Sequence, residues 1–407
     1  MSRGTFVGFG FGPIQAGLML CEAMESGNFG EYAVAEIDQR LVDAVRSNSD
    51  SVSINIAGKN GISTRVLAGI RLLNPQVTRD RGELVDAIRR SGELATAIPS
   101  VSLYGSGGEA SIAALLAEAV GPELPRILYA SENNNFAAEI LHEELRRRAP
   151  RERFSTLQIL NTVIGKMSGV ISSAEEMLRL GLAPLVPGFE KCVLVEEFNR
   201  ILVSRITLPG FRRGIGVFEE KDDLLPFEEA KLYGHNAIHA LLGYLARLRG
   251  YAAMSEAKAD AELMGIGRKA FLEESGAALI RRHGKTGDPL FTEPGFAAYA
   301  DDLLERMTNP YLQDSVERVI RDPVRKLGWS DRLFGTMRVA LEQGVEPRLM
   351  ALGAAAAVSF ALESAASGTT PREYLLSLWG EESAGVHKET CLRMVEESMP
   401  RLLPWRK

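Results

Sequence analysis

Apolar positions in the first half of the chain form short continuous runs that alternate with helically spaced segments, a pattern typical of a parallel sheet covered by helices. Residues 5–10, TFVGFG, are a short apolar run that ends in glycine, and residues 14–26 then carry apolar side chains at helical spacing. A second apolar run at 31–38 ends in the acids Glu36 and Asp38. This order of strand, glycine turn, helix, strand and acid predicts a mononucleotide-binding unit.

The same alternation continues to about residue 165. Residues 51–58 and 63–74 look like a hairpin or an irregular insertion. Further strands are expected at 92–100, 126–133 and 156–165, with helices around 106–120 and 136–149. The pattern therefore predicts an α/β fold that begins with a Rossmann-type dinucleotide-binding domain at residues 1–192.

From about residue 193 the pattern changes, and helical periodicity dominates to the end of the chain. We expect an all-α second domain at residues 193–407, which would carry the substrate and the catalytic groups. The composition, 45% hydrophobic and 25% charged, is ordinary for a globular protein.

Charge and cysteine content narrow the class of protein. The net charge of -6 argues against nucleic acid or an anionic membrane as the main partner. Cys21, Cys192 and Cys391 are far apart and indicate neither a disulfide framework nor a zinc site. No apolar run reaches the roughly 18 residues of a membrane span, so we expect a soluble, cytoplasmic protein.

Two phasings of the glycine turn are possible. Gly8 and Gly10 fit the dinucleotide fingerprint if Pro13 takes the third place, and Gly10 and Gly12 fit if Gln15 takes it. We prefer the second phasing, because Pro13 then falls near the first helical position, where proline is tolerated. The alternative is a tight turn that binds no ligand.

The acid-ended second strand favours NAD over NADP, because a carboxylate accepts hydrogen bonds from a ribose diol and repels a 2′-phosphate. Polar residues also follow two later strands, although helix capping is an alternative role for the asparagines at 133–135. The residues predicted to bind the cofactor are Gly10, Gly12, Pro13, Ile14, Gln15, Glu36, Asp38, Ala97, Glu132 and Asn133.

The most informative stretch of the second half is the apolar helix predicted at 226–250. At 100° per residue, Glu228, Lys231, Asn236 and His239 share one face of it. Burial would lower the pKa of the lysine toward the range of a general base. The alternative is the polar edge of a half-exposed helix with a packed histidine. His235 falls on the same face, so spacing alone does not choose between the two histidines.

Residues 231–246, KLYGHNAIHALLGYLA, resemble the K-x-x-x-x-N-x-x-H helix of the polyol-specific long-chain dehydrogenases, the mannitol dehydrogenase family. The resemblance covers nearly the whole chain, through residues 9–18, 34–45, 95–100, 127–135, 193–203, 272–284 and 309–333.

That resemblance implies an NAD-dependent enzyme without a catalytic metal, a monomer or small homo-oligomer. Lys231 would remove a proton as hydride leaves the carbinol carbon, while Asn236 and His239 would hold and polarise the reacting oxygen. It also favours His239 over His235, and it places Glu228 on the proton path.

The small-molecule partner implied is a polyol or polyol phosphate and its ketose, with mannitol 1-phosphate and fructose 6-phosphate as the leading pair. An unphosphorylated polyol or a sugar acid is the nearest alternative. A non-catalytic NAD- or sugar-binding protein on the same scaffold is a second alternative.

One departure from the family pattern concerns the end of the strand at 156–165. The family carries a polar residue and a serine where this chain has Ile164 and Gly165. Asn161 or Lys166 would have to replace the lost polar contact.

Recognition of a phosphate or of the polyol chain is expected from Arg318, Arg325 and Lys326 in the matching C-terminal stretch. Their alternative role is to be solvated or to pair with nearby acids, namely Asp314, Glu317, Asp322 and Asp331.

Overall fold

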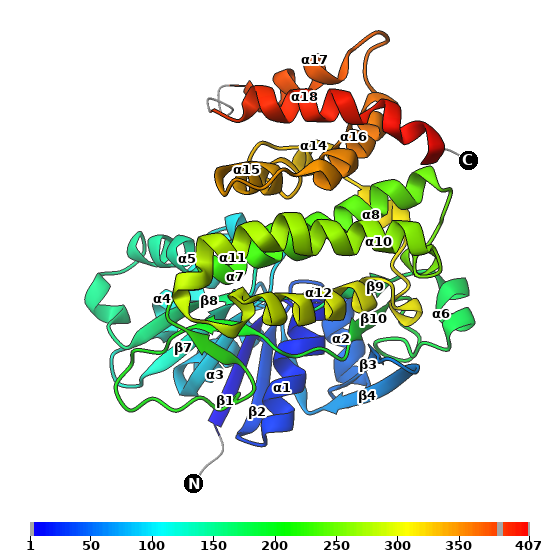
Figure 1. Ribbon diagram of the computed structural model, residues 1–407. Helices are drawn as coiled ribbons and strands as arrows, with labels where there is room; N and C mark the ends of the chain where they lie inside the picture. The colour runs from blue at the N-terminus through cyan, green and yellow to red at the C-terminus, as the bar shows by residue number, and fades with distance from the viewer. Residues whose placement is uncertain (1–3, 381–385, 406–407) are drawn as a thin grey trace. The chain divides into compact units, whose positions relative to one another are not determined.

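The computed structural model describes residues 4–380 and 386–405. The chain divides into two compact units, Met1–Leu225 and Pro226–Lys407 (Figure 1). The first unit thus extends beyond residue 192, where the first domain was expected to end. Residues 192–221 contain three short strands in place of the expected helical pattern. A short apolar run such as 193–195 fits a strand or a helix equally well, and pairing with distant strands decided the outcome.

The first unit is built on an eight-stranded sheet. Its strand order is β12-β11-β8-β7-β6-β1-β2-β5, in which β5, β2, β1, β6, β7 and β8 are parallel and β11 runs antiparallel to β8. The strands are β1 (Gly4–Phe9), β2 (Phe29–Ala35), β5 (Ile70–Leu73), β6 (Ser91–Thr96), β7 (Arg126–Ala130), β8 (Leu157–Val163), β11 (Leu202–Ser204) and β12 (Glu219–Lys221). The predicted Rossmann-type α/β fold is confirmed.

A second sheet of four strands, ordered β4-β3-β10-β9, belongs to the same unit. Its strands are β3 (Ser51–Ala57), β4 (Ile62–Ala68), β9 (Ser168–Ile171) and β10 (Cys192–Glu196). The antiparallel pairing of β3 with β4 confirms the hairpin, one of the two alternatives for this region. The run expected at 63–74 is divided, however, because Ile70–Leu73 forms β5 of the main sheet. The parallel pairing of β10 with β3 brings residues from the end of the unit back to its beginning.

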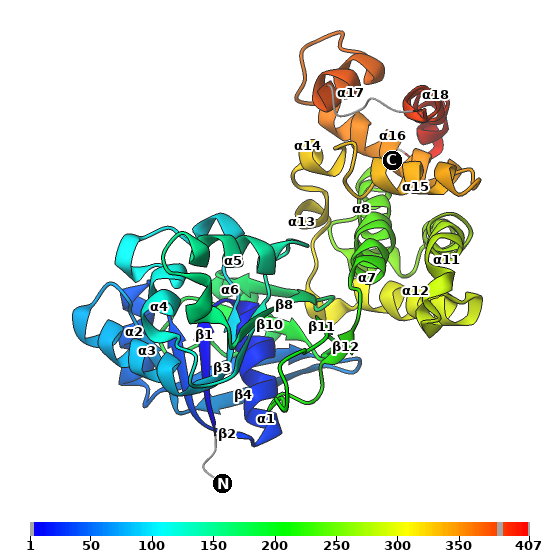
Figure 2. The same ribbon diagram turned by 90° about the vertical axis from the view of Figure 1, so that its left-hand side faces the viewer.

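Apolar side chains lie on both faces of the main sheet, as buried parallel strands require. Alternate residues of β1 serve the two faces: Phe6 packs with η1, α2 and β3, and Val7 packs with α3, α4 and α5. Figure 2 shows α3, α4 and α5 on the side of the sheet away from α1. The helices of this unit are η1 (Gln15–Leu20), α1 (Cys21–Ser26), α2 (Gln39–Ser47), α3 (Thr78–Arg90), α4 (Ile112–Ala119), α5 (Ala137–Arg146) and α6 (Ala174–Leu180).

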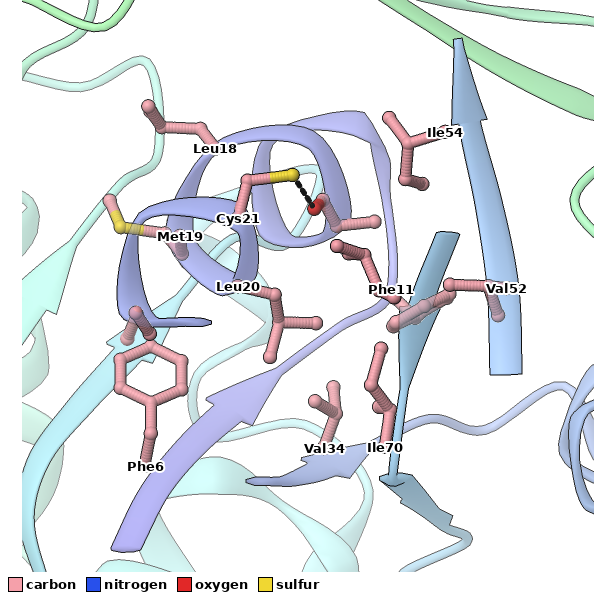
Figure 3. Close-up of a cluster of buried hydrophobic side chains, with 14 of the residues drawn as sticks. Phe6, Phe11, Leu18, Met19, Leu20, Cys21, Val34, Val52, Ile54 and Ile70 are labelled. Atoms are coloured by element: carbon pink, nitrogen blue, oxygen red, sulfur yellow. Dashed lines mark hydrogen bonds between the residues drawn. The ribbon is translucent and has the colours of Figure 1, made fainter. Parts of the chain in front are cut away.

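The helix that follows the glycine turn is pressed between the two sheets. Its first part, η1, is π-helical, and Cys21 Sγ donates a hydrogen bond of 3.3 Å to the carbonyl of Ala16, five residues earlier (Figure 3). A Cβ atom placed on Gly17 would lie 2.4 Å from Val195 Cγ1 on β10. Only glycine at position 17 allows the second sheet to approach the helix this closely.

The second unit is helical throughout its described residues, so the expected all-α region is confirmed from Pro226 onward. It comprises α7 (Leu225–Glu229), η5 (Ala230–Asn236), α8 (Ala237–Leu248), α9 (Met254–Ala257), α10 (Ala261–Lys269), η6 (Ala270–Gly276), α11 (Ala277–His283), α12 (Glu293–Met307), α13 (Val316–Ile320), α14 (Pro323–Lys326), α15 (Phe334–Glu342), α16 (Arg348–Leu362), α17 (Pro371–Trp379) and α18 (Lys388–Ser398). Helix α8 packs on α10, α13 and α16, and the π-helical segments η5 and η6 touch each other.

The contact between Gly17 and β10 makes a stability prediction. We expect Gly17→Ala to lower the free energy of unfolding by about 1–3 kcal/mol, because overpacking a well-packed core costs that much. Gly82 in α3 is the matched control, since a Cβ atom there meets nothing within 4 Å. Gly82→Ala should raise stability by about 0.5–1 kcal/mol. Urea unfolding measures both, and a stabilised Gly17→Ala variant would contradict the close packing of β10.

Candidate active site

A pocket of about 810 Å³ lies in the first unit, where β1, β2, β6 and β7 end. This is where open parallel sheets bind nucleotides. Nine of the ten residues predicted to contact a cofactor border the pocket. They are Gly10, Gly12, Pro13, Ile14, Glu36, Asp38, Ala97, Glu132 and Asn133.

The glycine turn has the geometry of a dinucleotide cradle. Gly10 has a φ of +79°, and a Cβ atom on it would lie 2.9 Å from the carbonyl oxygen of Ala97. A Cβ atom on Gly12 would meet nothing within 4 Å, so the backbone there is open to a ligand. Both glycines border the pocket and Gly8 does not, which agrees with the preferred phasing.

Gln15 is the exception among the predicted cofactor residues. Its side chain is fully buried and does not border the pocket. It fills the space next to Gly8, where a Cβ atom would lie 2.4 Å from Gln15 Nε2. The place of the fingerprint's third glycine is therefore used for packing the helix on β1, and the prediction that Gln15 contacts the cofactor is not supported.

The two acids after β2 have different local roles. Glu36 Oε2 accepts a hydrogen bond of 3.0 Å from the Phe11 backbone N–H, and its Oε1 accepts one of 2.8 Å from the Asp38 N–H. Glu36 thus ties the glycine turn to the end of β2. Asp38 Oδ1 accepts a hydrogen bond of 3.1 Å from the Arg40 N–H and caps helix α2.

Glu132 is almost fully buried at the pocket wall. It accepts hydrogen bonds from Thr96 Oγ1 (2.9 Å), the Ile98 N–H (3.0 Å) and the Tyr104 hydroxyl. Burial raises the pKa of this carboxyl, although the three donors oppose the shift. Glu132 therefore braces the loop after β6. Asn134 Oδ1 accepts from the Phe136 N–H at 2.8 Å in the turn before α5, but no side chain caps that helix, so the capping role considered for the asparagines is not seen.

The second sheet supplies a wall of the pocket that the sequence did not indicate. Val170, Leu185, Phe189, Lys191, Cys192 and Val193 border it from this side. Lys191 is the one basic side chain among the described residues that line the pocket. No local motif marks these positions, because they reach the glycine turn only through the pairing of β10 with β3.

The predicted lysine helix is present, but it is not a continuous α-helix. Its middle part, η5 (Ala230–Asn236), is π-helical and lies between α7 and α8. Lys231 and Asn236 are five residues apart, the spacing of a π-helical hydrogen bond, and the wider turn brings the directions of their side chains closer together. In a continuous α-helix they would be separated by about 140°. Glu228, Lys231, Asn236 and His239 form the half-buried face of this helix.

Buried hydroxyl groups from two other helices hold the π-helical turn. The carbonyl oxygen of Tyr233 accepts a hydrogen bond of 2.7 Å from Ser275 Oγ. Thr336 Oγ1 lies 3.2 Å from the same oxygen and shares its proton with the carbonyl of Arg332, to which it is closer. Both donors are 1% exposed. Glycine is needed nearby, because a Cβ atom on Gly234 would lie 3.0 Å from the Phe271 ring.

The electrostatic surroundings of Lys231 make its neutral form more accessible than that of an ordinary lysine. Its pKa is lowered to about 8, mainly by burial and then by the positive charge of Arg332, while Glu228 acts in the opposite direction. Arg332 was not singled out from the sequence. Its Nε donates to Asp331 Oδ1 at 2.7 Å, and its side chain is 13% exposed. This ion pair orients the guanidinium of Arg332, two residues before α15 begins at Phe334.

The structure distinguishes His235 from His239, a choice that helical spacing left open. His235 is buried, and burial, followed by the charges of His239 and Arg306, lowers its pKa well below the ordinary value. His239 lies on the half-buried face with Lys231, and its Nε2 is 3.0 Å from Asp314 Oδ2. Asp314 is buried, and its other oxygen accepts from Arg318 Nε at 2.7 Å.

The three predicted substrate-binding cations are all engaged within the chain. Arg318 pairs with Asp314, and Arg325 Nε lies 3.1 Å from Asp322 Oδ2, so both have partners among the acids considered for them. Lys326 is buried, and its Nζ donates to the carbonyl of Arg321. Their role toward a substrate stays a prediction.

The departure at Ile164 also has a structural account. Ile164 packs against the apolar core of the first unit. Asn161 Oδ1 accepts from the Ala138 N–H at 2.8 Å, and its Nδ2 donates to Glu139 Oε2 at 2.9 Å. Lys166 Nζ donates to the carbonyl of Phe198 at 2.8 Å. Both candidates for the missing polar contact are therefore in use.

Residues 4–380 and 386–405 contain no group of three or more His, Cys, Asp or Glu side chains arranged to hold a metal ion. They also contain no helix that is both long enough and apolar enough to cross a membrane.

A Rossmann-type pocket followed by an all-helical unit with a lysine on a half-buried face defines a dehydrogenase fold. Residues 223–383 match the family model of the mannitol dehydrogenase C-terminal domain. This match and the curated relative described next confirm the resemblance of the chain to the polyol-specific long-chain dehydrogenases, the mannitol dehydrogenase family.

Individual relatives agree with this assignment. The chain is 28% identical over 367 residues to a mannitol-1-phosphate 5-dehydrogenase of Caldanaerobacter subterraneus subsp. tengcongensis, covering 90% of this chain and 89% of the relative. A substrate-free D-sorbitol dehydrogenase has a similar fold, with a TM-score of 0.75 at 15% identity over 99% of this chain and 95% of that one. The Pseudomonas fluorescens mannitol 2-dehydrogenase, in a ternary complex with NAD and D-mannitol, gives 0.65 at 17% identity over 98% and 92%.

The hydrogen bonds to Tyr233 can be tested by stability measurements. The double variant Ser275→Ala, Thr336→Val removes both side-chain donors to a buried carbonyl. We expect a loss of about 1–3 kcal/mol in the free energy of unfolding, the cost of an unsatisfied buried polar group. Ser377→Ala is the control, because the exposed Ser377 Oγ donates a similar bond of 2.8 Å to the Tyr374 carbonyl. Equal, small effects of both changes would show that the π-helical turn does not depend on these donors.

Proposed function

We propose that the protein is an NAD-dependent dehydrogenase that interconverts a polyol, or a polyol phosphate, and the corresponding ketose. The observation that carries the proposal is the alignment of Lys231 with Asn236 and His239 on one half-buried helix face, where the pKa of the lysine is about 8. The dinucleotide-type pocket of the first unit and the match to the mannitol dehydrogenase family support it.

The proposed roles follow from the chemistry of each side chain. Bound NAD would accept a hydride from the carbinol carbon. Lys231 in its neutral form removes the hydroxyl proton as the hydride departs, and the nearby Glu228 is the candidate for passing that proton on. Asn236 and His239 donate hydrogen bonds to the oxygen and stabilise the negative charge that develops on it.

The residues of the pocket fit NAD better than NADP. Gly10 and Gly12 leave room for a pyrophosphate, and Glu36 and Asp38 place carboxylates at the end of β2. A carboxylate at this point accepts ribose hydroxyls and repels a 2′-phosphate.

Mannitol 1-phosphate and fructose 6-phosphate are the proposed substrate pair. The curated relative that is 28% identical is named for mannitol 1-phosphate. In addition, the positive charge of Arg332 acts on Lys231, His235 and Lys326, while Arg332 itself pairs with Asp331. A guanidinium whose charge reaches Lys231 supports an anionic substrate over a neutral polyol. Assays with phosphorylated and unphosphorylated polyols, followed by NADH absorbance, decide between the two.

Lys231→Ala tests the catalytic assignment. We expect kcat for polyol oxidation to fall by about 10²- to 10⁴-fold, the usual contribution of a general base, with NADH affinity unchanged. Lys269→Ala, on the exposed surface of α10, is the control. Turnover by the Lys231→Ala variant equal to that of wild type would rule out the lysine as base.

The rate of polyol oxidation is expected to increase with pH, and the rate of ketose reduction to decrease. The base must be unprotonated for oxidation, so kcat/KM for polyol oxidation should rise with pH and level off above the Lys231 pKa of about 8. Ketose reduction needs the protonated lysine, so its kcat/KM should fall over the same range. Profiles of wild type between pH 6 and pH 10 measure both limbs. A flat oxidation profile through pH 8 would contradict this role for the lysine.

Arg332→Gln tests the preference for a phosphorylated substrate. Loss of a charged hydrogen bond should lower kcat/KM for the polyol phosphate by about 10- to 100-fold more than for the unphosphorylated polyol. The rising limb of the pH profile should also move to higher pH, because a positive neighbour of Lys231 is removed. Arg325→Gln, an exposed cation paired with Asp322, serves as control. An equal loss on both substrates would leave Arg332 without a role in phosphate recognition.

A further inference from the structure

The charges that line the pocket of the first unit are unbalanced for a dinucleotide ligand. Glu36, Asp38 and Glu132 are acidic, and Lys191 is the one basic residue that borders the pocket within the described part of the chain. A dinucleotide carries a negatively charged pyrophosphate, which backbone N–H groups at a glycine turn neutralise only in part. A cation on the opposite wall would complete the charge complementarity.

The segment that leads into β10 places Lys191 on the wall of the pocket that the second sheet supplies. Lys191 directly precedes β10, and Cys192 and Val193, the first residues of the strand, border the pocket with it. Further along the same row of residues 191–195, Val195 contacts the helix at Gly17.

The lengths of the strand and of the helix explain why the row of residues 191–195 extends beyond the glycine turn. Four residues of strand cover about 13 Å. Four residues of helix, from Gly17 back to Pro13, cover about 6 Å. A strand that touches the helix at Gly17 therefore reaches beyond the start of the helix when it arrives at Lys191.

The backbone at Lys191 is held in place, whereas its side chain is exposed. The carbonyl of Lys191 accepts a hydrogen bond of 2.8 Å from the Leu185 N–H, and the following residue, Cys192, pairs with Ile171 on β9. The ammonium group is a mobile point charge on a four-carbon stem, which suits contact with a phosphate oxygen.

We propose that Lys191 binds the pyrophosphate of the dinucleotide cofactor across the pocket from Gly10 and Gly12. The contact rests on the proposed function, since it assumes that the pocket binds NAD. It gives the second sheet a part in cofactor binding in addition to its packing on the helix.

Binding measurements on the full chain test this contact without substrate turnover. NADH, ADP-ribose and adenosine are titrated by calorimetry into wild type and into Lys191→Gln. We expect Lys191→Gln to weaken the binding of NADH and ADP-ribose by about 2- to 5-fold, the value of a partly exposed ion pair, and to leave the binding of adenosine unchanged. The affinity of wild type for NADH should also depend more steeply on salt than that of the variant.

Two further variants separate charge at this position from overall charge. Lys191→Arg retains a cation and should bind NADH within about twofold of wild type. Arg205→Gln removes one positive charge from an exposed residue that follows β11, outside the pocket, and should have no effect. A thermal melt of each variant shows that it is folded.

The outcomes distinguish this contact from the proposed function. If wild type binds NADH and Lys191→Gln binds it equally well, or if adenosine is weakened as much as NADH, the Lys191 contact is wrong and the proposed function stands. If wild type binds neither NADH nor ADP-ribose, both proposals fail.

Discussion

The proposed catalytic face of the second unit depends on a π-helical turn, and buried hydroxyl groups support that turn. Ser275 Oγ donates a hydrogen bond to the carbonyl oxygen of Tyr233, and Thr336 Oγ1 lies 3.2 Å from the same oxygen. In a regular α-helix, Lys231 and Asn236 would diverge by about 140°. The wider turn brings the directions of these two side chains closer together. The geometry on which their proposed roles rest is therefore supported by side chains from other helices.

In the first unit, glycine residues allow the helix after the turn to pack closely on its neighbours. Its fingerprint lacks the third glycine that normally lets the helix approach the strand, and Gln15 occupies that place. The close approach is kept because Gly8 on the strand leaves room for the Gln15 side chain. On its other side the helix has Gly17 against Val195, so the second sheet can pack close to it. The small residues that permit close packing therefore stand at Gly8 on the strand and Gly17 on the helix, and not at the third position of the fingerprint.

The sequence could predict those features whose residues lie close together along the chain. The strand, the turn at Gly10 and the acid at Glu36 lie within about thirty residues, and nine of the ten predicted cofactor residues border the pocket. Lys191 and Arg332 were missed because their positions depend on contacts between distant segments. The π-helical turn was missed for the same reason, since its supporting hydroxyls lie 42 and 103 residues away.

The electrostatics of the second unit assign different tasks to groups that lie close together. Burial alone would raise the pKa of Asp314, but His239 and Arg318 outweigh it and hold the value at about 2. Lys231 titrates near pH 8, so Asp314 stays charged over the whole range in which the lysine changes state. A permanent negative charge therefore lies 3.0 Å from His239 Nε2 at every pH at which Lys231 gains or loses its proton. Burial thus has different outcomes within this unit: it lowers the pKa of Lys231, whereas at Asp314 the paired groups outweigh it.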